Sequence, residues 1–297
     1  SNAYIETFEN NVRHLAQQGD TRLRRFVSEV NRQSEKHNWD RLAQSDYRAK
    51  TGARMVSPAG GGSDGGVGTD TGLAWTRRQT LAATYDAGEV IEMEDPIQML
   101  IDPTSASTQN LAMSMRRAVD DRIIAAATGT ARDGTGTENQ TWDTNQQVGT
   151  GIATITLADL IAVQQIFNTN DVDVDERKCL VVGPAQWAQL LGVTEVVSTD
   201  FQRSQALATG MLPNVMGFDI ILSNRLLEDA AGGSAAGKTM CLAFTKKGIG
   251  LHVARDITAR VGERADMSFA WQLYTQMTMN AVRVEDEHVV GLYVSDA

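Results

Sequence analysis

The longest amphipathic pattern in the chain lies between residues 102 and 129. Four apolar residues recur at every fourth position and would form one stripe along a helix: Leu111, Met115, Val119 and Ile123. Asp102 before Pro103 is typical of an N-cap and a first helical residue, and Gly129 is typical of a C-terminal stop. The pattern predicts a helix over residues 102–129, roughly 40 Å long at about 1.5 Å per residue. It is either a spine on which other elements pack or an ordinary long core helix.

Residues 4–34 carry two shorter helical patterns. The apolar positions of the first are Ile5, Phe8, Val12 and Leu15. After a break at Gly19-Asp20, the apolar positions of the second are Leu23, Phe26, Val27 and Val30. No strand pattern follows closely enough to close a core over them. We therefore expect two helices that form an N-terminal arm.

Residues 40–95 have a different pattern, because large apolar residues are scarce. Two polar, extended segments, Gln44–Ser57 and Leu73–Glu92, flank a stretch with seven glycines from Gly60 to Gly72. Such a stretch has no strong conformational preference, so the region predicts a long β-hairpin with a flexible tip. A two-stranded hairpin with so little apolar surface is not stable alone. We expect it to protrude from the body and to lie on a partner.

The second half of the chain alternates helical and strand patterns. Residues 130–155 are rich in Gly, Thr and Asn and are expected to be a loop or loose hairpin carrying Trp142. Thr156 and Asp159 have the spacing of a capping box at the start of a helix. A compact α/β subdomain is predicted over 157–255, with strands Cys179–Val182, Phe218–Leu222 and Met240–Phe244 and a short helix after Gly183-Pro184. Strands are expected afterwards at Ile257–Val261, Ser268–Val284 and His288–Val294.

The composition is that of a folded globular protein, with 42% hydrophobic and 22% charged residues. No run of ~18 apolar residues is present to span a membrane, and no signal peptide opens the sequence. Residues 1–3, Ser-Asn-Ala, resemble the remnant of a removed expression tag and are excluded from the interpretation. Cys179 and Cys241 lie in apolar strand patterns, which favours buried free thiols in a reducing compartment.

The net charge of −10 is unevenly distributed. Residues 1–78 hold 12 Lys and Arg against 9 Asp and Glu, whereas residues 79–297 hold 15 against 28. An acidic body with a mildly basic leading region argues against a general DNA-binding surface. It suits copies of the chain that lay the leading region of one on the body of the next. An ordinary solvated surface explains the charge equally well.

One motif matches a phosphate-binding loop letter for letter. Residues 232–239 fit G-x-x-x-x-G-K-[ST], with Gly232, Gly237, Lys238 and Thr239 at the defining positions. That loop follows a strand directly and opens a helix at the lysine, so that the helix N-terminus faces the phosphates. Here the expected strand ends at Leu222, and the residues after Lys238 have a strand pattern. We interpret the match as a chance one in a loop between two strands, and expect no cofactor.

Other arrangements that resemble chemistry are incomplete. Asp171, Asp173 and Asp175 imitate the start of a calcium-binding loop, but Glu176 replaces the glycine that this loop requires. The four histidines lack metal-binding spacing, and residues 285–288, Glu-Asp-Glu-His, are better explained as a surface turn. No G-x-S-x-G nucleophile elbow is present. The sequence predicts neither a catalytic site nor a metal site.

The order of these parts resembles the major capsid proteins of tailed phages, which have the Hong Kong 97 capsid fold. Arm, long hairpin, spine helix, α/β subdomain and returning strands follow one another as in that family over nearly the whole chain. The local matches are Asp95-Pro96, Asp102-Pro103, VVGPAQWAQLLG at 181–192, GMLPNVMGFDIILSNRL at 210–226, AFTKKGIGL at 243–251 and AVRVEDEHVVGLYVSDA at 281–297. No single match is diagnostic, and their order carries the resemblance.

The resemblance implies an α+β fold with named parts. They are an N-arm at 4–39, an extended loop at 40–95, a peripheral domain at 96–156 and 256–283 built on the spine helix, and an axial domain at 157–255 and 284–297. The spine stripe is then expected to face the strands of 256–283. Assembly contacts are expected at the cations of the extended loop: Arg48, Lys50, Arg54, Arg77 and Arg78.

The same resemblance implies a structural protein rather than an enzyme. Copies of the chain would form hexamers and pentamers and close an icosahedral head around double-stranded DNA, which is held without sequence-specific binding. A scaffolding protein and a portal are the other expected partners, with assembly in the host cytoplasm and no membrane involved. One alternative is an encapsulin-like shell of the same fold around a protein cargo. The other is a nucleotide-binding enzyme that uses Lys238 and Thr239.

Overall fold

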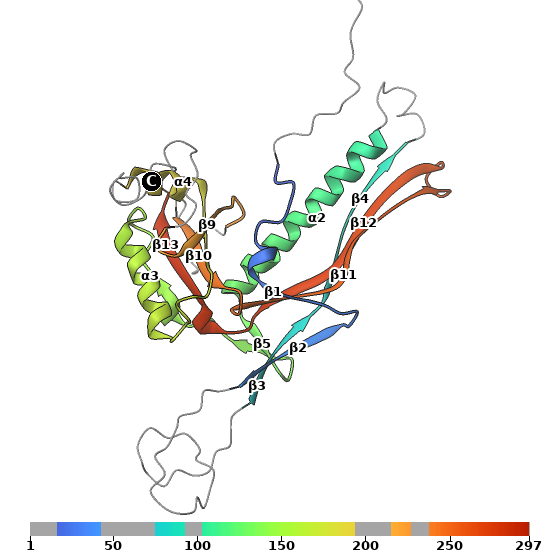
Figure 1. Ribbon diagram of the computed structural model, residues 1–297. Helices are drawn as coiled ribbons and strands as arrows, with labels where there is room; N and C mark the ends of the chain where they lie inside the picture. Colours follow the sequence, from blue (N-terminus) through green and yellow to red (C-terminus); the bar gives the residue numbers. More distant parts are fainter. Residues whose placement is uncertain (1–16, 43–74, 93–102, 194–214, 227–237, 297) are drawn as a thin grey trace, which may run out of the picture.

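The computed structural model describes residues 17–42, 75–92, 103–193, 215–226 and 238–296. The first predicted helix of the arm, the glycine-rich hairpin tip and the predicted N-cap Asp102 lie outside these residues. Within them the chain forms three sheets, three α-helices and three short 3-10 turns. The sheets meet near the base of a long helix, which sets the shape of the molecule (Figure 1).

The long helix lies along a four-stranded sheet. The helix is α2 (Pro103–Thr128), so the predicted spine is confirmed to within one residue at each end. The strand order is β1-β11-β12-β4. The strands are β1 (Ser28–Asn31), β4 (Ala83–Ile91), β11 (Ile249–Arg264) and β12 (Ala270–Arg283). β11 and β12 pair antiparallel along nearly their whole length and form a long ribbon beside α2 (Figure 1).

The apolar stripe of α2 determines where the helix packs. Met115, Val119 and Ile123 are at most 4% exposed and share one core with Met277 and Met279 of β12. Burying each such side chain contributes roughly 1.5–3 kcal/mol. The helix contacts β12, β4 and β11, so the predicted packing of the spine on the long strands is confirmed.

A five-stranded sheet with two helices forms the second body. Its strand order is β7-β13-β10-β8-β9. The strands are β7 (Gln147–Val148), β8 (Lys178–Val182), β9 (Phe218–Leu222), β10 (Lys238–Thr245) and β13 (Val289–Ser295), with the turn η2 (Thr144–Gln146) before β7. α3 (Leu157–Thr169) starts at the predicted capping box of Thr156 and Asp159, and α4 (Pro184–Gly192) follows Gly183. The strands predicted for this subdomain are confirmed, and both cysteines are buried and free.

The third sheet is small and has the order β2-β3-β5-β6. β2 (Lys36–Leu42) and β3 (Trp75–Leu81) pair antiparallel and together form the stem. β5 (Ala131–Asp133) and β6 (Glu138–Gln140) form the hairpin expected after the spine. The predicted hairpin is present as this stem, but its first predicted arm, Gln44–Ser57, lies outside the described residues, and its second, Leu73–Glu92, is divided between two sheets. Its paired strands begin at Lys36, and β4, assigned to the second arm, pairs with β12 instead.

The prediction of a second N-terminal helix is wrong. Its residues form a single 3-10 turn, η1 (Arg24–Phe26), followed by β1, which pairs in parallel with β11. Leu23, Phe26 and Val27 are buried in the main core rather than on a separate arm. The free edge of β11 supplies backbone partners that a helix would leave unused, so tertiary pairing overrides the helical spacing.

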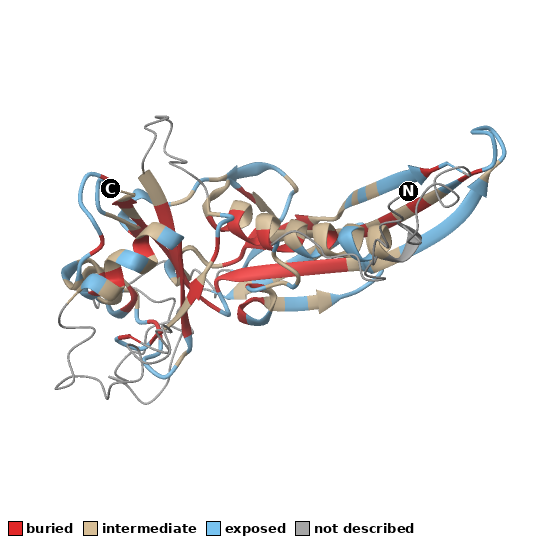
Figure 2. Ribbon diagram, turned by 90° about the horizontal axis from the view of Figure 1, so that it is seen from above, coloured by how far each residue is buried: buried red, intermediate tan, exposed pale blue. Residues whose placement is uncertain are grey.

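The largest core lies where the two bodies meet. Residues of α2 and of β11 and β12 share it with Met240, Leu242 and Phe244 of β10. Figure 2 shows buried residues concentrated in this region, and exposure increasing toward the far end of the ribbon. The second core lies between α3 and the outer face of the five-stranded sheet, around Leu160, Val163 and Phe167.

Candidate assembly surfaces

The residues of the phosphate-loop match do not form a nucleotide site. Lys238 and Thr239 are the first residues of strand β10, so no helix begins at the lysine. The Thr239 hydroxyl donates to a carboxylate oxygen of Asp296 at 2.6 Å, and Lys238 Nζ donates to the carbonyl of Thr150 at 3.4 Å. Gly232 and Gly237 lie outside the described residues. Both described side chains are thus used within the five-stranded body.

A metal site is likewise not formed by the residues that the structure describes. Among them no group of three or more His, Cys, Asp or Glu side chains converges on one point. Asp171, Asp173 and Asp175 lie in the turn between α3 and β8. The acidic segment predicted to be a surface turn contains the 3-10 turn η3 (Asp286–His288), which connects β12 to β13. No helix in the described ranges is long and apolar enough to cross a membrane.

The predicted assembly cations differ in position and in exposure. Arg48, Lys50 and Arg54 lie outside the described residues. Arg77 is 60% exposed on the stem and forms an ion pair with Asp40 on the neighbouring strand. Arg78 is only 5% exposed and pairs with Asp286 inside the chain, at 3.0 Å. Arg78 therefore stabilises the monomer and is not available to a neighbour, because alternate strand residues point to opposite faces.

An apolar surface lies at the far end of the β11–β12 ribbon. The exposed apolar residues near this end, which form the ribbon-tip surface, are Val261, Met267, Phe269 and Trp271, and Val90 is exposed on the opposite face of the sheet. Phe269 is 57% exposed, and it and Ser268 have positive φ angles of 61° and 50°. Non-glycine residues adopt such angles infrequently and at an energetic cost. Large apolar side chains gathered at a protruding end are typical of a protein–protein contact.

The ribbon-tip surface was not predicted from the sequence. Phe269 and Trp271 belong to a run that predicts a strand, and strand patterns with apolar residues are normally interpreted as core. The run does show an anomaly, because Arg264, Glu263 and Asp266 precede it closely. A charged turn directly before aromatic residues indicates that the strand starts in solvent. That signal could have located the surface from the sequence.

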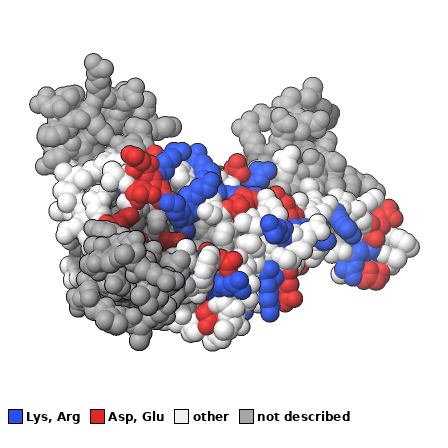
Figure 3. Space-filling view, turned by 60° about the horizontal axis from the view of Figure 1, so that its bottom comes forward, with Lys and Arg blue, Asp and Glu red and all other residues white. Residues whose placement is uncertain are grey.

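The end of the stem carries a second apolar pair. Leu42 and Trp75 face each other in register and are 50% and 69% exposed. They adjoin the exposed Arg77–Asp40 pair, which gives the stem an outer surface of mixed character. Acidic and basic side chains lie side by side on the face seen in Figure 3, with no extended area of one sign among its described residues. Contacts there would be short-range and sensitive to salt.

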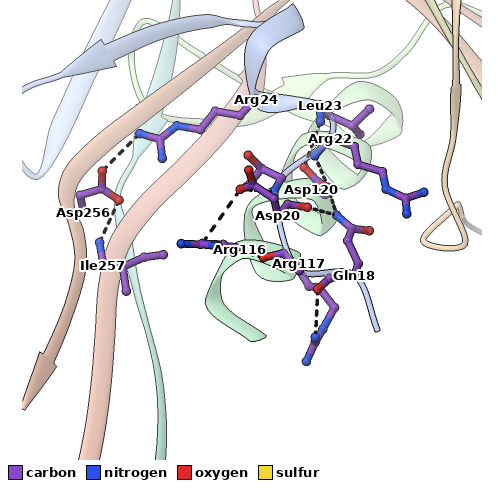
Figure 4. A network of polar contacts seen from close by, with 12 residues as sticks. Gln18, Asp20, Arg22, Leu23, Arg24, Arg116, Arg117, Asp120, Asp256 and Ile257 are labelled. Carbon is purple, nitrogen blue, oxygen red and sulfur yellow. Dashed lines mark hydrogen bonds and ion pairs between the residues drawn. The ribbon is translucent and has the colours of Figure 1, made fainter. Parts of the chain in front are cut away.

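The N-terminal segment is attached to the spine by a polar network (Figure 4). Asp120 of α2 is fully buried and accepts hydrogen bonds from the backbone N–H groups of Arg22 and Leu23, at 2.9 and 3.2 Å, and from the Gln18 amide. Burial raises the pKa of Asp120, and these donors oppose that shift. Two arginines of the helix donate to carbonyls of the same segment, Arg116 to Gly19 and Arg117 to Gln18. The path of the chain toward its N-terminus is thereby fixed along α2.

Comparison with solved structures gives the class of the fold. The capsid of cyanophage Pam1 superposes with a TM-score of 0.72 at 14% identity, covering 99% of this chain and 97% of the other. A structure of Mycobacterium phage Che8 gives 0.70 at 15% identity, covering 98% and 97%. The mature capsid of bacteriophage PhiM1 gives 0.68 at 15% identity, covering 99% and 93%. The fold is therefore the Hong Kong 97 capsid fold.

The sequence comparison identifies the family. The model of the phage capsid protein family matches residues 1–295. The chain belongs to the phage capsid protein family, and it is a structural protein of the virion. No curated protein sequence matches the chain.

Proposed function

We propose that this chain is the major capsid protein of a tailed phage or prophage, and that it forms hexamers and pentamers that close an icosahedral head. The observation that carries the proposal is the exposed apolar side chains of the described residues at the ribbon tip and at the end of the stem. These two surfaces lie at opposite extremities of the molecule (Figure 1). A subunit with contacts at both extremities can bind more than one neighbour, as a closed shell requires.

The parts named from the resemblance are proposed with modified limits. The axial domain comprises the five-stranded sheet with α3 and α4, and the peripheral domain comprises α2 with the four-stranded sheet. The extended loop begins at the stem, and β1 joins the peripheral sheet rather than the N-arm. The chain has no catalytic role in this proposal. Its further partners are a scaffolding protein, a portal and packaged double-stranded DNA.

The charge of the chain suits DNA that is enclosed but not bound in sequence-specific fashion. The net charge is −10, and the excess of acidic residues lies after residue 78. Like charges repel across the Debye length, about 10 Å at 0.1 M salt. Packaged DNA would therefore slide along the shell rather than adhere to it. An encapsulin-like shell would hold protein cargo instead.

Electron microscopy of the purified full-length chain tests this proposal. Closed shells, or rings of five and six subunits, are expected when the protein is concentrated under crowding conditions. Particles from the natural source are expected to protect double-stranded DNA from nuclease. Particles that contain protein and no DNA would favour the compartment shell. A chain that stays monomeric and binds ATP in a manner abolished by Lys238→Ala would contradict the proposal.

A further inference from the structure

The two large sheets are joined at one place by two adjacent crossovers. Residues 246–248 lead from β10 to β11, and residues 284–288, which include η3, lead from β12 to β13. The Val284 N–H donates to the carbonyl of Gly248 at 2.8 Å, and Thr245 and His288 are joined by a side-chain hydrogen bond of 2.7 Å. A Cβ on Gly248 would lie 2.8 Å from the carbonyl oxygen of His288. Any change of angle between the sheets must therefore move η3.

Asp286 of η3 connects the spine to the stem. Arg283, at 0% exposure, donates through Nε to one carboxylate oxygen of Asp286, and Arg78 of β3 donates to the other oxygen at 3.0 Å. The remaining donors of Arg283 bind three carbonyls: Ala127 at 3.1 Å, Gly129 at 2.6 Å and Gln140 at 3.0 Å. The first two are at the C-terminus of α2, where a cation is favoured by the helix dipole. One carboxylate thus lies between two arginines that belong to different bodies.

The inner face of the stem makes the remaining connections. Because side chains alternate along a strand, Trp39, Arg41 and Arg78 share one face. Arg41 pairs with Glu287 of η3 at 3.5 Å, so each strand of the stem holds one residue of that turn. Trp39 lies on the backbone of Gly250, where a Cβ would be 2.6 Å from its ring. The outer face carries the Asp40–Arg77 pair, which touches neither large sheet.

The stem has a short ladder with β5, and β3 continues through Ala82 into β4 of the four-stranded sheet. The ladder with β5 consists of two residue pairs, Arg78 with Asp133 and Gln79 with Arg132. A ladder of two residue pairs allows the stem to rotate about the ladder axis. Side-chain contacts must therefore fix the angle between the stem and the large sheets. Trp39 on Gly250 and the hydrogen bond from Asn280 to the Leu81 carbonyl hold the stem against the four-stranded sheet, and the two ion pairs join it to η3. Burial lowers the pKa of Arg78, which is consistent with a guanidinium taken out of water to reach Asp286.

We propose that the turn Glu285–His288 is a coupling joint, in which Asp286 and Glu287 transmit a change of angle between the two large sheets to the stem. Bending of the body at the crossovers then redirects the stem through Arg78 and Arg41. The consequence for assembly rests on the proposed function: a subunit would adjust the direction of its extended loop to the local curvature of the shell. The coupling itself is a property of the single chain.

Spin labels on the single chain test the coupling. Leu42→Cys on the stem and Gly262→Cys on the ribbon provide two exposed sites. Cys179 and Cys241 are 1% and 0% exposed, and burial raises the pKa of the Cys241 thiol to about 12, so neither competes for label. Arg41→Gln with Arg78→Met removes both ion pairs. Asp286 keeps Arg283 in that variant, so no buried charge is left alone and the fold is retained.

The distance between the two labels is measured in five proteins. The distribution is expected to be narrow in the labelled parent, broad in Arg41→Gln/Arg78→Met, and narrow in the matched control Asp40→Asn/Arg77→Gln, which removes the outward pair. Gly248→Ala displaces η3 and is expected to shift the mean distance in the parent but not in the background that lacks both arginines. Equal shifts in the two backgrounds, or an unchanged distribution in Arg41→Gln/Arg78→Met, would overturn the coupling.

Electron microscopy of the shells formed by the parent and by the variant tests the coupling joint and the proposed function separately. Arg41→Gln/Arg78→Met is expected to lower the thermal midpoint, because the buried Arg78–Asp286 pair is lost, but to remain folded at assembly temperature and to give shells of mixed size and curvature. Uniform shells from that variant would overturn the assembly consequence. If the parent forms no shells or rings, the proposed function fails, and the label distances still decide whether the joint exists.

Discussion

At the scale of single residues, some positions are determined by a neighbour far away in the sequence. Gly250 is the clearest case, since the ring of Trp39 occupies the space of its missing side chain. The thiols are another, because burial within strands makes them inert. Strand residues were placed correctly from their apolar runs, but nothing in the sequence links Trp39 to Gly250.

Gly250→Ala is expected to destabilise the chain. The new Cβ would lie 2.6 Å from the Trp39 ring, which must then leave the surface of β11. Overpacking of this kind costs about 1–3 kcal/mol. Gly262→Ala in the same strand is the control, because nothing lies within 4 Å of its Cβ position. Urea unfolding of both variants measures the difference, and equal midpoints would contradict the expectation.

Asp133 should make the β5–β6 hairpin sensitive to acid. Hydrogen bonds from the Thr135 hydroxyl, the Thr137 N–H and the Asn139 amide lower the pKa of Asp133 to about 2 from 3.8. A lowered pKa in the folded state means that its stabilisation is present above pH 3.8 and is lost as the pH falls toward about 2. Unfolding curves of the parent and of Asp133→Asn are expected to converge over that interval. A constant difference between them would argue against this role.

Single residues also show which contacts can be predicted from the sequence. The capping box of Thr156 and Asp159 was found because its two members are three residues apart. The Arg283–Asp286 pair is equally local, yet its importance depends on carbonyls of Ala127 and Gly129, more than 150 positions earlier. Local spacing encodes helix ends and strands. Which buried charges meet is decided only after the chain has folded.

At the scale of elements, the spacing of apolar residues predicted a helix correctly where the tertiary contacts bury the same residues. The stripe of α2 faces the long strands, as its spacing indicates. The segment 23–30 has a similar spacing but becomes a turn and a strand, because the edge of β11 competes for its backbone. The stem shows the same limit, since β4 is as polar as its supposed partner strand but pairs with β12.

Removing Asp120 should release the N-terminal segment from α2. In Asp120→Ala the backbone N–H groups of Arg22 and Leu23 lose their acceptor in a buried setting. Unsatisfied buried groups cost about 1–3 kcal/mol each. Hydrogen exchange is expected to increase over residues 20–31 and to remain unchanged in α3.

Asp121→Ala is the matched control for this prediction. Asp121 is the adjacent residue and forms a partly exposed pair with Arg225, and such pairs contribute about 0–1 kcal/mol. It should leave exchange over residues 20–31 as in the parent. If both variants behave alike, Asp120 does not hold the segment.

At the scale of the whole molecule, the monomer has the features of a subunit of a larger assembly. Its core is continuous where the two bodies meet, whereas its extremities are apolar and uncovered. A protein that functioned alone would gain little from an exposed Phe269 in a strained backbone conformation. The family assignment and the distribution of exposed apolar residues agree on a subunit.

Polar substitution at the ribbon tip should weaken assembly while the monomer stays folded. Phe269→Asn suits the positive φ angle there, and Trp271→Thr retains strand propensity. The thermal midpoint of the double variant is expected to fall below that of the parent, because Trp271 is only 37% exposed, but to stay above the assay temperature. Loss of an apolar contact of about 1.4 kcal/mol per interface raises the concentration needed for association about tenfold. Light scattering across a concentration series measures this.

Val174→Ser is the control for the ribbon tip. Val174 is 79% exposed in a turn of the five-stranded body, away from the ribbon. It should associate like the parent. Association of the ribbon-tip double variant at parental concentrations would exclude that surface from the interface.

The parallel pairing of β1 with β11 has a consequence for how the protein is made. Ser28 pairs with Gly250, so the ladder cannot close until nearly the whole chain has left the ribosome. Synthesis proceeds at about 5–20 residues per second, which leaves Leu23, Phe26 and Val27 without their partners on β11 for at least about ten seconds. During that time the nascent chain exposes apolar residues that a chaperone can bind. The pairing of β1 is thus completed only after β11 has been made, later than the contacts of Arg22 and Leu23 with Asp120 of α2 can form.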